Sequence, residues 1–254
     1  MLKKYLAPAA ALLCGCAAAF IRSRELSSGY DEKGLPIKGA AVTVILAAFC
    51  VIFIAAAFAF AVKTAAGKES GVGVTAAFAG EPAELALSAL FAAAAAVCGV
   101  LIALAKAGGE TASKIYGYGA AASALALLGG ELLTMGKRND AAAGTLLALP
   151  AAYFAFAMAF AYSAHAADPA IMLCAYKCAA LGTSALFFIY SASFSFCKKA
   201  PKLTVAFGLI SSFFLILCIP DYSAGAERFF FAFIAASAAA RTGRFIGSLH
   251  KKEI

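Results

Sequence analysis

Eight apolar runs, each about 17 to 27 residues long, follow one another along this chain with only short polar connectors between them. Such lengths match the ~30 Å hydrocarbon core of a lipid bilayer, because an α-helix rises about 1.5 Å per residue. The pattern predicts an all-α integral membrane protein, a polytopic bundle of about eight transmembrane helices. The predicted spans are residues 5–21, 40–62, 83–105, 115–136, 141–164, 170–196, 203–219 and 222–240.

Composition supports the same class of protein. Hydrophobic residues make up 64% of the chain and charged residues 13%, whereas about 25% of a soluble globular domain is charged. No connector approaches the ~50 residues that a separate soluble domain needs. We therefore expect one transmembrane helical domain over residues 1–254, with the lipid bilayer as its main partner.

The net charge of +8 does not indicate a nucleic-acid partner. The basic residues stand singly or in pairs at the ends of apolar runs, where they contact lipid headgroups and set the orientation of the spans. With eight spans both termini lie on one side, and most Lys and Arg residues fall on that side. We predict a bacterial-type inner-membrane protein with both termini in the cytoplasm, although the basic connector at 22–39 then lies outside.

The last span is the hardest to assign. Residues 229–240 are only twelve residues between Arg228 and Arg241. They cross the membrane only if the helix begins near Tyr222 and takes Glu227 and Arg228 with it. We expect it to cross, and the alternative is seven spans followed by an interfacial C-terminal helix.

The N-terminal run has a second interpretation. Basic residues, an apolar stretch and then Cys14, Gly15 and Cys16 are similar to a bacterial lipoprotein signal, in which Cys16 would carry the lipid. Because apolar residues continue through Ile21, we expect an uncleaved helix instead. The eight cysteines lie in or beside apolar runs, so we predict no disulfide framework.

Small residues recur inside the predicted spans, and Ala is the most frequent of them. Lipid tails are as apolar as Leu, so transmembrane helices associate through close contact, which small residues permit. We expect a tightly packed bundle. Matches to small-residue pairing motifs are too numerous to single out one face for a homo-oligomer or a partner membrane protein.

Ionisable groups at membrane depth are the main functional candidates, because burying them is costly. Glu131 lies about five residues inside its span, close to Lys137 and Arg138. It could be a carboxylate that couples transport to protons or cations. Alternatively, it reaches the membrane interface or pairs with a polar group on a neighbouring helix.

Three further polar residues lie near the other membrane surface. Lys177 can extend its long side chain toward the headgroups, or it can pair with Glu227 at the wall of an outward-facing cavity. Arg228 lies at the same depth as Glu227. A pair between Lys177 and Glu131 is not favoured, because parallel spans separate them by about 15 Å along the membrane normal.

The sequence contains no recognisable catalytic or metal-binding pattern. Cys174 and Cys178 share a helix face, but no His or acid joins them at ligand spacing, so we expect core packing. His165 and His250 lie outside the predicted spans, which excludes haem held by two histidines within the helices. We expect no cofactor and no enzymatic activity. The leading hypothesis is a small transporter-like or transport-associated bundle, of unknown substrate; the alternative is a non-catalytic subunit or sensor that packs against partner membrane proteins.

Overall fold

The computed structural model describes residues 3–31, 35, 37, 39–66, 73–136, 139–165, 174–196 and 199–250. Long α-helices make up most of this part of the chain: α1 (Lys3–Ser28), α2 (Ala41–Ala65), α4 (Pro82–Lys106), α5 (Thr111–Met135), α6 (Asp140–His165), α7 (Ala175–Ser193), α8 (Pro201–Leu217) and α9 (Gly225–His250). Short helical turns lie between them: α3 (Val74–Ala77), η2 (Phe194–Phe196) and η3 (Ile219–Asp221). The described residues contain no β-strand.

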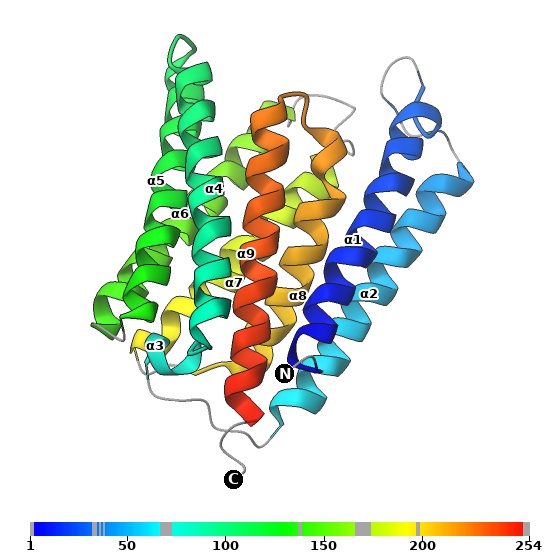
Figure 1. The fold of residues 1–254 in the computed structure, drawn as a ribbon. Helices are drawn as coiled ribbons and strands as arrows, with labels where there is room; N and C mark the ends of the chain where they lie inside the picture. The colour runs from blue at the N-terminus through cyan, green and yellow to red at the C-terminus, as the bar shows by residue number, and fades with distance from the viewer. Residues whose placement is uncertain are drawn as a thin grey trace.

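The long helices run alternately up and down, so that α1 begins and α9 ends at the same end of the bundle (Figure 1). We call this the terminal end, and the end where η3 joins α8 to α9 the opposite end. Seven of the described helices are long and apolar enough to cross a membrane, and α8 is shorter at 17 residues. The predicted fold class, a polytopic helical membrane bundle of about seven to eight helices, is confirmed.

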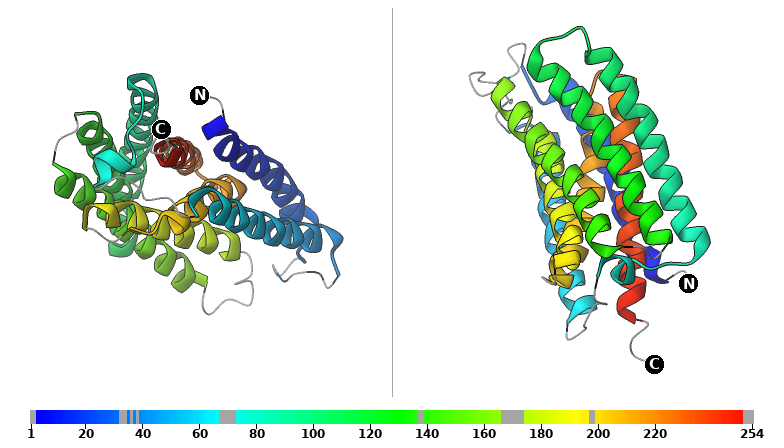
Figure 2. Two further views of the ribbon diagram at one scale, coloured as in Figure 1. Left: turned by 90° about the horizontal axis from the view of Figure 1, so that it is seen from below. Right: turned by 90° about the vertical axis from the view of Figure 1, so that its left-hand side faces the viewer.

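The C-terminal helix is where the sequence-based boundaries are most in error. We predicted a span over 222–240, whereas α9 is a 26-residue helix from Gly225 to His250. It packs against α1, α4 and α8 near the middle of the bundle (Figure 2), so the alternative with an interfacial C-terminal helix is wrong. The helix continues past Arg241 because that side chain is buried and paired inside the bundle.

Two other predicted boundaries also change. The first span was expected to end at residue 21, but α1 continues to Ser28, so Arg22 belongs to a helix and not to the following connector. The span predicted over 170–196 contains α7, which begins at Ala175, and the turn η2. Residues 166–173 lie outside the described part of the chain. Lys177 is therefore the third residue of α7.

Small residues bring the helix backbones together as expected. A Cβ atom added to Gly99 on α4 would lie 2.9 Å from the Cα of Ala121 on α5. One added to Gly117 on α5 would lie 3.0 Å from the Cα of Ala103 on α4. The two helices thus approach more closely than a larger residue at either glycine would allow.

Aromatic rings fill the wider spaces between the helices. Phe154 on α6 stacks against Phe188 on α7 with ring centroids 5.7 Å apart, and Phe53 on α2 stacks against Phe213 on α8 at 4.1 Å. The core thus combines close alanine and glycine contacts with stacked phenylalanines, so α6 to α9 pack into a continuous apolar interior.

Candidate functional site

Glu131 is fully buried on α5 and binds two arginines of α9. Its Oε1 accepts a hydrogen bond from Nη1 of Arg241, and its Oε2 accepts one from Nη2 of Arg244, both at 2.6 Å. All three side chains have no solvent exposure. Residues three apart on a helix lie on the same face, so both arginines of α9 can reach one carboxylate. We call these three residues the α9 cluster.

A fourth side chain ties the α9 cluster to another helix. Nη2 of Arg244 also donates to Oγ of Ser88, a buried residue of α4, at 3.1 Å. The polar contacts therefore join α4, α5 and α9 inside the bundle. Since Glu131 lies four residues from the end of α5, the cluster is roughly 6 Å along the helix axis from that end.

The α9 cluster carries two positive groups and one negative group, and many of its donors have no acceptor. Among the described residues, Nε and Nη2 of Arg241 and Nε and Nη1 of Arg244 are buried without a hydrogen-bond partner. The guanidinium of Arg241 lies over the ring of Phe78 at 4.5 Å, a contact that offsets part of its charge. The local environment is thus net positive and rich in unused donors.

The turn α3 lies at the terminal end of the bundle (Figure 1), and the residue that follows it, Phe78, contacts Arg241 of the cluster. Oδ1 of Asp140 accepts hydrogen bonds from the backbone N–H and the hydroxyl of Thr75, at 2.8 and 2.6 Å. The hydroxyl of Ser248 on α9 donates to the carbonyl of Ala77 at 2.7 Å. These bonds attach α3 to both α6 and α9.

Gly80 and Glu84, just before and within the first turn of α4, lie close to Arg244. A Cβ atom added to Gly80 would lie 2.7 Å from Cδ of Arg244, so only glycine leaves room for the arginine stem at this position. Glu84, in the first turn of α4, forms an ion pair with Lys4 of α1 and accepts the backbone N–H of Glu81. Its carboxylate is therefore engaged by other donors.

A second buried ionic group lies at the opposite end and was not singled out from the sequence. Nε of Arg22 binds Oδ1 of Asp221 at 2.8 Å, and its Nη1 binds Oε2 of Glu25 at 2.6 Å and the hydroxyl of Tyr30 at 3.1 Å. Its guanidinium also lies over the ring of Tyr176, at 4.9 Å. We call Arg22, Glu25 and Asp221 the Arg22 cluster.

The electrostatics of the Arg22 cluster are the reverse of those of the α9 cluster. Among the described residues, Arg22 pairs with two carboxylates, and Oε1 of Glu25 and Oδ2 of Asp221 are buried without a hydrogen-bond partner. Burial raises the pKa of the Asp221 carboxyl above its ordinary value, although the neighbouring Arg22 acts in the opposite direction. This end therefore has unused acceptors, where the terminal end has unused donors.

The structure does not bring Lys177 and Glu227 together as an ion pair. Nζ of Lys177 lies over the ring of Tyr222, at 4.3 Å from its centroid, and Glu227 instead faces Lys106 of α4 at 3.7 Å. Arg228 donates from Nε to the carbonyl of Tyr222 at 2.6 Å. The proposed pair is thus corrected: Lys177 lies in the first turn of α7 over an aromatic ring, and α4 supplies the partner of Glu227.

Of the alternatives for Glu131, the structure shows pairing with polar groups on a neighbouring helix. Lys137 and Arg138, which we considered as nearby interface residues, lie outside the described part of the chain. Sequence reasoning missed Arg241 and Arg244 because they seemed to end the last span. The signal available was that Phe245, Ile246 and Leu249 continue the apolar pattern beyond them.

The described residues contain no group of three or more His, Cys, Asp or Glu that could hold a metal ion. The polar chemistry of the interior therefore rests on arginine, carboxylate and hydroxyl groups. Comparison with known proteins adds no family to this description: no protein-family model, no curated protein and no solved structure matches the chain.

Proposed function

We propose that this protein is a small transporter-like bundle of the bacterial inner membrane, with the α9 cluster as its polar core. The observation that carries the proposal is the presence of Glu131, Arg241 and Arg244, fully buried in contact with one another in a membrane bundle. Charged groups at membrane depth are rare, and they are functional candidates because they mark substrate and ion pathways.

Stability alone does not account for such a cluster. Removing charges from water costs several kcal/mol per ion, and well-packed apolar residues of similar volume hold helices together as well or better. The rest of this interior is apolar and closely packed. A role for the charges in binding or conformational change therefore explains their presence better than helix packing does.

The two ionic clusters lie toward different ends of the bundle, which supports a transport cycle. The Arg22 cluster joins α1 to η3 at the opposite end, and the α9 cluster joins α4, α5 and α9 toward the terminal end. From Gly225 to Arg241 is about 24 Å along α9. Each cluster can hold its end closed, and breaking one set of ion pairs would open that end alone.

The contacts of Glu131 favour a different role from the proton coupling considered from the sequence. A carboxylate that carries protons must exist in the neutral form for part of its cycle. Two guanidinium groups at 2.6 Å instead stabilise the ionised form. We therefore propose that Glu131 is an ion-pair partner whose contacts with Arg241 and Arg244 change during the cycle, rather than a proton carrier.

The test is solute flux in proteoliposomes, screened over small cations and anions as a current on a solid-supported membrane. We expect at least one class to give a current with the wild type. The triple variant Glu131→Leu, Arg241→Met, Arg244→Met should lose that current at least tenfold while remaining folded, because it replaces charges by apolar groups of similar size. The single variant Glu131→Gln should lose it too.

Lys63→Gln is the matched control, since Lys63 is an exposed cation near the end of α2 at the same end of the bundle. It should retain the wild-type current. A wild type that moves none of the solutes, or a triple variant as active as the wild type, would reject the transport proposal.

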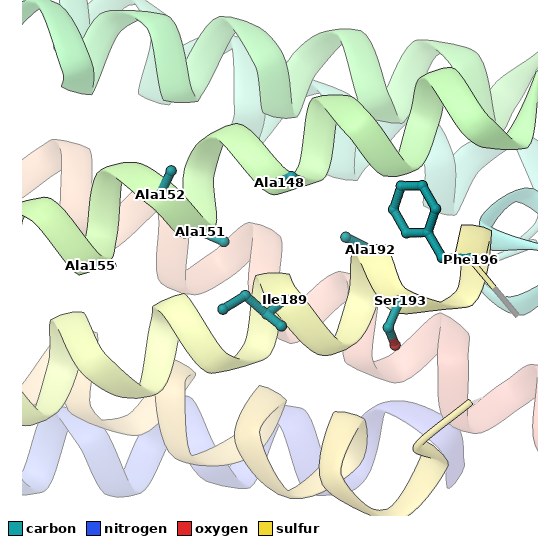
Figure 3. Close-up of a pocket in the computed structure, with 8 residues that line it drawn as sticks. All are labelled: Ala148, Ala151, Ala152, Ala155, Ile189, Ala192, Ser193 and Phe196. Atoms are coloured by element: carbon teal, nitrogen blue, oxygen red, sulfur yellow. The ribbon is translucent and has the colours of Figure 1, made fainter. Parts of the chain in front are cut away.

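The second candidate, a subunit that packs against a partner membrane protein, is favoured by the groove between α6 and α7 (Figure 3). A hollow of ≈ 430 Å³ is lined mainly by alanines of α6, with Ile189 and Ala192 of α7. The ring of Phe196 closes one end of it. Under this hypothesis a membrane protein co-purifies in fixed ratio, and Glu131→Gln, although less stable, has little effect on that association.

Sidedness forms part of the proposal. The start of α1 and the end of α9 lie at the same end of the bundle, and the distribution of Lys and Arg supports a cytoplasmic location for that end. We expect a fluorescent reporter that matures only in the cytoplasm to be bright at either terminus. A periplasm-dependent phosphatase fused to the α4–α5 connector should be active, and inactivity there would reverse the orientation.

A further inference from the structure

Among the described residues, no second carboxylate pairs with the two arginines of the α9 cluster. Glu131 of α5 is the carboxylate that binds Arg241 and Arg244. The acid of α4, Glu84, is paired with Lys4. Ser88 and the Phe78 ring are neutral partners. A buried charge without its counterion is strongly destabilising, so the arrangement calls for a second anion.

The unused donors are placed as an anion site requires. Nε and Nη2 of Arg241, both without a partner, form one edge of the planar guanidinium. Such an edge donates two parallel hydrogen bonds to two oxygens of a carboxylate or phosphate. Arg244, one helical turn away, has Nε and Nη1 without a partner. The four nitrogen atoms belong to side chains with essentially no solvent exposure.

We propose that Arg241 and Arg244 bind a small oxyanion: a phosphate, sulfate or carboxylate group, either as a free ion or as part of a lipid headgroup. The inference rests on the proposed function in that it names the ligand class of the same cluster. It concerns binding, however, and can be tested without flux. The anion occupies the unused donors, and Glu131 keeps the two arginines together when the anion is absent.

Access from the terminal end agrees with this assignment. Arg244 is six residues from the last residue of α9, about 9 Å along the helix. Phe78 contacts Arg241 on that side, and the segment before it is attached through Ala77 and Thr75. Displacement of this short segment would expose the arginines to the aqueous phase or to the headgroup layer.

The experiment is a thermal unfolding assay of the full-length protein in detergent, read by a dye that reacts with cysteines as they become exposed. Inorganic phosphate and sulfate are titrated against chloride at constant ionic strength. For a dissociation constant of about 1 mM, 20 mM phosphate should raise the unfolding midpoint by roughly 4 °C over chloride. A parallel arm compares nanodiscs of phosphatidylglycerol with nanodiscs of phosphatidylcholine.

Stabilisation by phosphate or sulfate assigns a free oxyanion, and stabilisation by phosphatidylglycerol alone assigns the headgroup. Absence of both overturns the proposal.

Arg241→Gln should abolish the shift and Lys63→Gln should retain it. Equal shifts in these two variants indicate non-specific binding and also overturn the proposal. If Arg241→Gln does not fold, Glu131→Gln decides, because the greater positive charge should enlarge the phosphate shift, and an unchanged or smaller shift counts against the site. Anion binding without flux would leave this inference standing while the transport proposal fails.

Discussion

Glu131→Gln is expected to lower the free energy of unfolding by about 3–5 kcal/mol, because it leaves two buried arginines without their counterion. The thermal midpoint in detergent should fall by roughly 10 °C. The measurement is the fraction of monodisperse protein that survives heating, followed by size-exclusion chromatography. Glutamine keeps the shape of glutamate but replaces one of its two accepting oxygens with an NH2 donor, so the loss reports on the charge together with one hydrogen bond to an arginine.

The triple variant Glu131→Leu, Arg241→Met, Arg244→Met supplies the complementary result. Removing all three charges together also removes the desolvation cost, so its stability should equal or exceed that of the wild type. Recovery in the triple variant would show that the cluster is retained for a reason other than stability. A triple variant less stable than Glu131→Gln alone would mean that the ion pairs themselves hold α5 against α9.

Arg22→Gln should have an effect of similar size at the opposite end. The variant leaves the carboxylates of Glu25 and Asp221 buried without their cation, which is expected to cost about 3–5 kcal/mol at pH 7. Arg24→Gln is the matched control, since Arg24 is exposed two residues further along the same helix and should change the stability by less than ~0.5 kcal/mol.

The pH dependence of Arg22→Gln distinguishes loss of charge compensation from loss of packing. Burial raises the pKa of Asp221 in the folded state. Between the pKa of the unfolded state and that of the folded state, the folded protein binds more protons, so its stability falls as the pH rises through this interval. Without Arg22 the pKa of Asp221 rises further, and lowering the pH from 7 to 5 should restore part of the midpoint. A midpoint difference from wild type that is independent of pH would contradict this explanation.

Hydrophobic run length was enough to predict most of the bundle. Runs such as 40–62 and 83–105 became helices with ends only a few residues away, because every backbone polar group in a bilayer must be bonded within its own helix. The prediction failed where charged residues were taken as span ends. The helices continue past Arg22 and Arg241 because each arginine forms an ion pair with a carboxylate from elsewhere in the chain.

Glu131 shows the same limit within the candidate site. Its position in an apolar run marked it as unusual, but its partners are 110 and 113 residues away in the sequence. Lys177 and Glu227 were expected near one membrane surface and as a possible pair, yet their neighbours in space are Tyr222 and Lys106. Depth in the membrane follows from position along a helix, whereas rotation and neighbours follow from packing.

The sequence by itself determined that this chain is a helical membrane protein, which helices it contains, and that Glu131 is an ionisable group inside one of them. These properties depend on local hydrophobicity and on the rise of an α-helix. Only the tertiary structure decided that Arg241 and Arg244 bind Glu131 while some of their N–H donors stay without a partner, and that Arg22 lies between two carboxylates. Those contacts depend on how distant helices pack, which the periodicity of any single segment does not specify.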